Sequence, residues 1–211
     1  MYNIYGNYKN ALASLLLAGL CFLCTLSLNP EKSRGQCSTC PSGAPDNTSI
    51  GWTFGGCYNT TLTIDGNSCP VIICWCFRYI SATNYFDYKV ACVKLTSPSC
   101  TTNPIPVSDF INNAATNLQN TDPGHSLYMD HMPPCNPPQG SMLVTRVVTA
   151  SCWIVEAVDG GMLISPCGNG GWCVLGQYWC KNDDGTPHFL GSFKTEYSGT
   201  CSYECNSVTC N

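Results

Sequence analysis

Alternating side chains in residues 70–80, PVIICWCFRYI, predict a β-strand. In an extended chain, successive side chains point to opposite faces of the sheet. One face receives Val71, Ile73, Trp75, Phe77 and Tyr79, and the other receives Ile72, Cys74, Cys76 and Ile80. Because both sets are mainly apolar, we expect this strand to be covered on both faces.

The rest of the chain carries the same kind of signal. Residues 59–69 predict a short strand that reaches a turn at Asp65-Gly66, and residues 85–95 predict a partner strand. Residues 141–158 form one long β-branched run that ends at Asp159-Gly160-Gly161, and a further hairpin signal lies at Asp184-Gly185. Turn signals every 8–15 residues predict a mainly β fold, an antiparallel sandwich or barrel-like sheet.

One short helix is predicted near residues 108–119. Ser108 is a suitable N-cap, and a single apolar side is formed by Phe110, Ile111, Ala114, Ala115 and Leu118. The proline- and glycine-rich stretch that follows has no periodicity and predicts a loop. We therefore divide the chain into an N-terminal arm at 28–56, a first β half at 57–103, a helix and proline-rich linker at 104–140, and a second β half at 141–211.

Residues 1–27 resemble a secretory signal peptide. Residues 11–28 are apolar and uncharged, and the small residues Thr25 and Ser27 precede a suitable cleavage point. Eighteen uncharged residues also reach the lower limit for a membrane span, so an uncleaved anchor is the alternative. Either reading predicts a secreted protein or one on the extracellular surface, with membrane contact only through this segment.

The cysteines predict disulfides. The chain has 18, and removing Cys21 and Cys24 with the signal leaves 16 (18 − 2), an even number suited to eight bridges in an oxidising compartment. Eight lie in residues 37–100 and eight in residues 135–210: Cys37, Cys40, Cys57, Cys69, Cys74, Cys76, Cys92 and Cys100 in the first group, and Cys135, Cys152, Cys167, Cys173, Cys180, Cys201, Cys205 and Cys210 in the second. We therefore expect two separately stapled halves.

Cys74 and Cys76 test that interpretation. On one face of a strand they lie about 6.5–7 Å apart, which is too far for a mutual bridge, so each needs its own partner. The alternatives are redox chemistry and metal binding. Cys37-Ser38-Thr39-Cys40 has the spacing of a redox pair but not its βαβ setting, and a zinc ribbon would need a second such pair.

Charge and motifs argue against most other chemistry. Only 10% of residues are charged, against about 25% in ordinary domains, and no basic stripe invites nucleic acid. We find no catalytic motif and expect no enzyme and no cofactor. His125 and His131 with Asp122 and Asp130 offer a metal alternative, although loop histidines are usually solvated. Asn182–Gly185 fits a hairpin turn better than a calcium loop.

The arm holds candidate contact residues. Ile50, Trp52 and Phe54 alternate on one face between glycines and prolines. They belong either to the first strand of their own sheet or to an arm that adds a strand to the next subunit. Trp75 and Phe77 complete the set of subunit-contact candidates. Asn47 and Asn59 lie in glycosylation acceptor patterns.

These features are typical of cysteine-rich structural proteins. We expect a secreted subunit of an extracellular filament or surface matrix whose main partner is another copy of itself, assembled by strand addition from the arm. The alternative is a secreted, adhesin-like module that binds glycan or protein, with exposed tryptophans against the ligand. An enzyme or enzyme inhibitor is the third hypothesis, and no motif supports it.

Overall fold

The computed structural model describes residues 37–46, 49–101, 104–136, 141–168 and 170–210. The expectations for the signal segment, for Cys21 and Cys24, and for Asn47 lie outside these residues. Cys37–Asn211 forms one compact unit. Among the described residues, no helix has both the length and the apolar character needed to cross a membrane.

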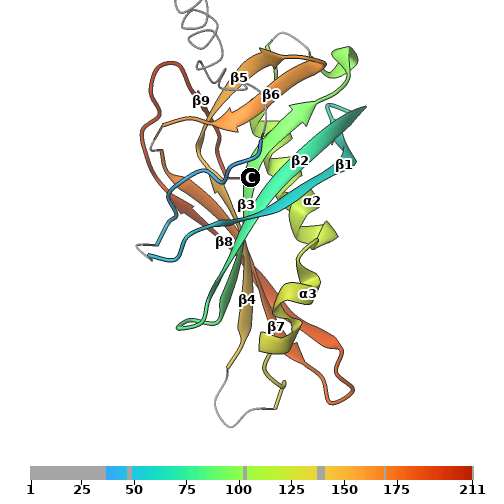
Figure 1. Cartoon of the computed structure of the whole chain (residues 1–211), viewed down its shortest axis with the longest axis vertical. Coiled ribbons are helices and arrows are strands. Elements are labelled where there is room, and N and C mark those ends of the chain that lie inside the picture. The colour runs from blue at the N-terminus through green and yellow to red at the C-terminus, as the bar shows by residue number, and fades with distance from the viewer. Residues whose placement is uncertain (1–36, 47–48, 102–103, 137–140, 169, 211) are drawn as a thin grey trace, which may run out of the picture. The chain divides into compact units, whose positions relative to one another are not determined.

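The mainly β, disulfide-rich class is confirmed. The strands form one nine-stranded mixed sheet, shown in Figure 1. They are β1 (Thr53–Ile64), β2 (Asn67–Ile80), β3 (Tyr85–Leu95), β4 (Leu143–Ala150), β5 (Cys152–Val158), β6 (Gly161–Pro166), β7 (Trp172–Lys181), β8 (Pro187–Tyr197) and β9 (Asn206–Ser207). Four short or medium helical segments complete the unit: η1 (Pro98–Cys100), α2 (Val107–Thr121), α3 (His125–Tyr128) and η2 (Met129–His131).

Strand β3 organises the sheet. One of its edges pairs along its length with β2, which in turn pairs with β1. The other edge is shared, because β4 pairs with its first residues and β6 with its last. Two branches follow, β4-β7-β8 and β6-β5-β9. Among the pairs of named strands in the described residues, only β3–β4 is parallel, because the chain between them crosses over through α2 and returns in the same direction.

The predicted hairpin turns are present. Asp65 and Gly66 both have positive φ, 50° and 78°, which is the backbone of the two-residue turn joining β1 to β2. Asp184 accepts hydrogen bonds from the backbone N–H and the hydroxyl of Thr186, and Gly185 has φ 85° in the turn between β7 and β8. The second stretch is therefore a hairpin turn, as the residue types indicated.

The β-branched run over 141–158 forms two strands, β4 and β5. The run breaks at Ser151, where the chain passes from β4 in one branch to β5 in the other. Ser151 donates its N–H to Gly171 and its carbonyl accepts from Val208, so its backbone bonds go to loop and C-terminal segments. A β-branched run is compatible with both arrangements, and only the pairing partners decide between them.

Helix α2 covers one face of the sheet. It runs from Val107 to Thr121, slightly longer than predicted, and its expected apolar side is buried: Phe110, Ile111, Ala114, Ala115 and Leu118. The N-cap is Pro106 rather than Ser108, and no side chain caps the helix. The predicted loop beyond it contains α3 and η2. The helix packs against β1, β3 and β4, and this layer holds the main core.

Eight disulfides brace the sheet, and none crosses between the halves. The pairs are Cys37–Cys92, Cys40–Cys76, Cys57–Cys74 and Cys69–Cys100 in the first half, and Cys135–Cys180, Cys152–Cys201, Cys167–Cys205 and Cys173–Cys210 in the second. The separate partners expected for Cys74 and Cys76 are confirmed. The two stapled halves nevertheless build one sheet, because β3 and β4 pair directly.

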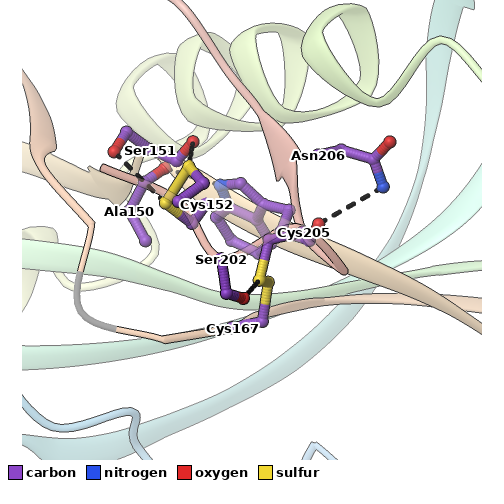
Figure 2. The surroundings of a disulfide bond; sticks show 9 residues. Ala150, Ser151, Cys152, Cys167, Ser202, Cys205 and Asn206 are labelled. Atoms are coloured by element: carbon purple, nitrogen blue, oxygen red, sulfur yellow. Dashed lines mark hydrogen bonds between the residues drawn. A yellow bond between two sulfur atoms is a disulfide. The ribbon is translucent and has the colours of Figure 1, made fainter. Parts of the chain in front are cut away.

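Disulfides and hydrogen bonds hold the C-terminal segment against β5 and the loop that follows β6. Figure 2 shows Cys152 in one bridge and Cys167 and Cys205 in another, with Asn206 beside them. The Asn206 side-chain amide donates to the carbonyl of Trp153 at 3.3 Å, while Cys152 pairs with Ser207 in the β5–β9 ladder. The two-residue strand β9 is thus held by covalent bonds as well as by ladder hydrogen bonds.

Candidate functional site: the arm and its buried ion network

The described part of the N-terminal arm that precedes β1, residues 37–46 and 49–52, is fastened to the face of the sheet opposite α2. Cys74 and Cys76 project to that face, whereas Ile73 and Trp75 project into the helix-side core. The bridges Cys37–Cys92 and Cys40–Cys76 join the start of the arm to two neighbouring strands, β3 and β2. Figure 1 shows this segment in blue, in front of the strands and away from α2.

Beneath the arm, three adjacent strands carry charged side chains in one row. Asp87 on β3 is paired in register with Arg78 on β2 and with Arg146 on β4. Arg78 donates from Nε to Asp87 at 2.9 Å, and Arg146 donates from Nε and a terminal nitrogen at 2.6 and 2.7 Å. The three side chains are almost fully buried, and Asp87 has no exposed surface. The cross-strand register therefore builds an Arg–Asp–Arg row inside the molecule.

Asp46 of the arm forms ion pairs with both arginines of this row. Its two carboxylate oxygens lie 2.5 Å from Arg78 and 2.7 Å from Arg146. Partial burial raises the pKa of Asp46, but the hydrogen bonds from Arg146 and Arg78 outweigh burial and hold the pKa below its ordinary value. Two arginines and two aspartates thus balance in charge, and the pairing draws the arm onto the sheet.

Lys89 holds the first part of the arm. Its Nζ donates to the carbonyls of Pro41 at 2.9 Å and Ser42 at 3.4 Å, and it also contacts the carbonyl of Gly43. The rings of Trp52 and Trp172 lie 4.3 and 4.7 Å from Nζ, so the ammonium is placed between two indoles. The residue is 1% exposed.

Burial lowers the pKa of Lys89 to about 7. The positive charge of Arg78 acts in the same direction, and Asp87 opposes both. The carbonyls and indole rings favour the charged form, because a neutral amine has fewer N–H groups to donate and no charge to attract an aromatic face. Lys89 is therefore the group beneath the arm whose charge is most responsive near neutral pH.

An open pocket of about 610 Å³ lies beside the arm. Its lining includes Trp52, Asp46, Arg78 and Ser49. The indole N–H of Trp52 donates to the carbonyl of Gly43 at 3.0 Å, and the guanidinium of Arg78 lies 4.4 Å from the centre of the Trp52 ring. The pocket thus combines an aromatic side chain, a partly exposed carboxylate and hydroxyl groups, and can hold a small polar molecule.

The predicted contact residues lie in different environments. Ile50 and Phe54 are each 39% exposed, whereas Trp75 is 6% exposed and lies in the chain's own core. Phe77 is partly buried and stacks on Phe86 at 5.8 Å. Phe54 pairs with Cys76 of β2 in its own sheet, whereas Ile50 and Trp52 precede β1, which begins at Thr53.

Two of the four possible metal ligands of the proline-rich stretch, Asp122 and His125, belong to a hydrogen-bonded cluster. Asp122 has φ 45° at the end of α2, accepts hydrogen bonds from the hydroxyls of Tyr88 and Tyr128, and lies 3.0 Å from Nδ1 of His125. Burial raises the pKa of both tyrosines far above the usual value. The next largest cause is the negative charge of Asp122 for Tyr88, and the hydrogen bond to Asp122 for Tyr128. His131 instead stacks on Tyr79, with ring centres 4.1 Å apart.

The sequence contained one signal for the ion network, which the search for hydrophobic patterns did not use. Arg78, Asp87, Lys89 and Arg146 each interrupt an otherwise apolar strand. In a chain with so few charged residues, a charge within a strand covered on both faces needs a buried partner. Asp46, in the loop-like arm, carried no such signal, because loops hold isolated acids without a partner.

Comparisons with protein-family models, with curated proteins and with solved structures find no match to this chain.

Proposed function

We propose that this protein is an exported, non-enzymatic structural subunit that assembles with copies of itself into an extracellular filament or surface matrix. The observation that carries the proposal is the distribution of its bridges. Every cysteine of the described chain is in a disulfide, and these bridges reach the arm, both branches of the sheet and the C-terminal segment. Such bracing suits a protein that must keep its shape under proteolysis or load.

The disulfides also support the proposed location. They form and persist outside the reducing cytosol, so a chain with eight of them fits an extracellular or secreted protein. A free thiolate for catalysis is not available among the described cysteines, because all are bridged. The sequence has no recognised catalytic motif, which is why we propose a structural role instead of a reaction.

We place the self-association contacts at the edges of the sheet. The start of β1 pairs with its own β2, which leaves less of the arm available for donation to another copy. Among the described strands, β1 and β8 each pair with one neighbour only. Strand β8 also exposes Phe189, Leu190 and Tyr197 at 42–49%. A long edge with exposed apolar side chains favours pairing with another chain.

The proposal is tested with the full exported protein. Negative-stain microscopy and light scattering over a range of concentrations should detect ordered assemblies for the wild type. Leu190→Lys should abolish them, because charge on an edge strand opposes pairing. Leu127→Lys is the matched control, since Leu127 is similarly exposed, at 45%, but lies on helix α3 and not on an edge strand. A wild type that remains monomeric at high concentration would contradict the proposal.

A second candidate function is glycan binding, and the pocket beside Trp52 is the observation that favours it. Aromatic rings combined with carboxylate and hydroxyl groups suit sugars, which have apolar faces and polar edges. Ser49→Arg should block the pocket and leave the Asp46 ion pairs intact. Loss of glycan-array signal in this variant would support binding, and a wild type that binds no glycan would remove the candidate.

A further inference from the structure

Three cysteines lie side by side across three adjacent strands. Cys57 on β1 is paired in register with Cys74 on β2, and Cys74 is paired in register with Cys92 on β3. Residues directly opposite each other in antiparallel strands project to the same face. Here that face is the one beneath the arm, and the row holds sulfur atoms from two different disulfides.

The sulfur atoms of these bridges are close together. The Sγ atoms of Cys37, Cys74 and Cys92 all lie within 4.8 Å of one another. They are the one group of three or more Cys, His, Asp or Glu side chains found this close together within the described residues. Cys74 is bridged to Cys57, and Cys92 is bridged to Cys37 of the arm. Cys74 thus has two in-register neighbours, its bonded partner Cys57 on β1 and the cysteine Cys92 on β3, to which it is not bonded. A thiolate formed at Cys74 would have a disulfide sulfur within reach.

Exposure determines where an external thiol can enter. Cys57 is exposed on the open edge strand β1, whereas Cys74, Cys76 and Cys92 are 4%, 0% and 2% exposed. Cys37 of the arm is partly buried. Thiol–disulfide exchange requires access to a sulfur and proceeds by attack of a thiolate on it. Of the four sulfurs in the two neighbouring bridges, that of Cys57 belongs to the most accessible residue.

We propose that Cys57 is a site of covalent modification by a thiol, and that Cys74 relays the exchange to the arm. The incoming thiolate forms a mixed disulfide with Cys57 and expels Cys74 as a thiolate. The Cys74 thiolate attacks the sulfur of Cys92, forms the Cys74–Cys92 bridge and expels Cys37 as a thiolate, which then takes up a proton. One thiol is consumed and one is released, so the number of disulfides is unchanged and no oxidant or reductant is needed.

The backbone favours the new bridge. Opposite residues in adjacent antiparallel strands have Cα atoms about 4.5–5.5 Å apart, within the range that a disulfide spans. Cys57 and Cys74, in the equivalent relation one strand away, are bridged with a Cα separation of 4.0 Å. The exchange releases one anchor of the arm, and Cys40–Cys76 keeps the arm attached.

The first test uses the wild-type protein with reduced glutathione as the thiol. After an acid quench, free thiols are alkylated and the protein is digested at low pH, with cleavage after Trp75 to separate Cys74 from Cys76. We expect glutathione on Cys57, a Cys74–Cys92 cross-linked peptide and alkylated Cys37. Glutathione on another cysteine, or a free Cys74 beside an intact Cys37–Cys92 bridge, would overturn the proposal.

A second test needs no added thiol. Cys37→Ser leaves Cys92 without its partner, next to the Cys57–Cys74 bridge. We expect most of the alkylation to appear on Cys57, because the Cys92 thiolate displaces it from Cys74. Alkylation confined to Cys92 would refute the relay. The matched control is Cys135→Ser, in which the free thiol should stay on Cys180, a residue 2% exposed and outside the cysteine row.

Discussion

Asp87→Asn is the most informative single change in the ion network. Asn has nearly the shape of Asp, so packing is kept while the negative charge is removed. Asp87 has no exposed surface and is the shared partner of Arg78 and Arg146. After the change, the two buried guanidinium groups would keep their ion pairs with Asp46, which is 28% exposed, but would lose the fully buried carboxylate between them. The amide group of Asn would also direct N–H donors toward N–H donors.

The expected loss in unfolding free energy is about 3–5 kcal/mol, the cost of removing one member of a buried ion pair. The value belongs at the upper end, because two arginines lose their partner together. For a chain of this size each kcal/mol corresponds to about 2–4 °C, so the melting temperature should fall by about 6–20 °C. Asp46→Asn should cost about 1 kcal/mol, since its pairs are partly screened by solvent.

The measurement is thermal unfolding by circular dichroism, with urea unfolding for the free energies. Urea is preferred to guanidinium chloride because a salt would screen the ion pairs. Asp183→Asn is the matched control, since Asp183 is exposed in the β7–β8 turn and should change stability by less than about 0.5 kcal/mol. A loss below about 1 kcal/mol in Asp87→Asn would refute the view that the buried row depends on that charge.

The remaining predictions concern the arm contacts of Asp46 and Lys89 and the helix α2. Because the arginines lower the pKa of Asp46, its ion pairs stabilise the folded state at pH values above its ordinary pKa of 3.8, and this stabilisation is lost as the pH falls below that value. Lowering the pH should therefore destabilise the wild type more than it destabilises Asp46→Asn. Burial lowers the pKa of Lys89 from 10.5 to about 7, so between these pH values the unfolded chain binds more protons than the folded chain. The unfolding free energy of the wild type should therefore rise from pH 7 to pH 10 relative to that of Lys89→Met. If the difference between the two proteins does not change with pH, the folded pKa lies near 10.5. Phe110→Ala should lower the unfolding free energy measured in urea by about 3–5 kcal/mol, because the Phe110 side chain is fully buried. Ser108→Ala should change it by less than about 0.5 kcal/mol, because no side-chain hydrogen bond caps α2. A loss of about 1 kcal/mol in Ser108→Ala would show that Ser108 is the cap after all.

Local pattern was sufficient for the strands, turns and helix. Period-two apolar alternation predicted β2 and β3, Asp-Gly steps predicted two hairpin turns, and the apolar side of residues 108–119 predicted α2. These features depend on neighbours within a few residues, where backbone preference and side-chain direction decide the outcome. The separate partners of Cys74 and Cys76 also followed from strand geometry alone.

Contacts between distant segments decided the rest. The break at Ser151, the parallel β3–β4 pair and the fork at β3 depend on which strands lie side by side. The same is true of the candidate site, because the Arg78–Asp87–Arg146 row exists only through the register of β2, β3 and β4. A one-residue shift in that register would move each charge to the other face.

The sequence by itself determined the class of protein: mainly β and rich in cysteine, with eight cysteines in residues 37–100 and eight in residues 135–210. Composition and periodicity are properties of the chain read in order, so they survive without a structure. Only the tertiary structure decided which cysteines pair, that the arm lies on its own sheet, and that Lys89 of β3 and Asp46 of the arm make the contacts between the two. These contacts join residues up to 100 positions apart, and no local preference of the chain encodes them.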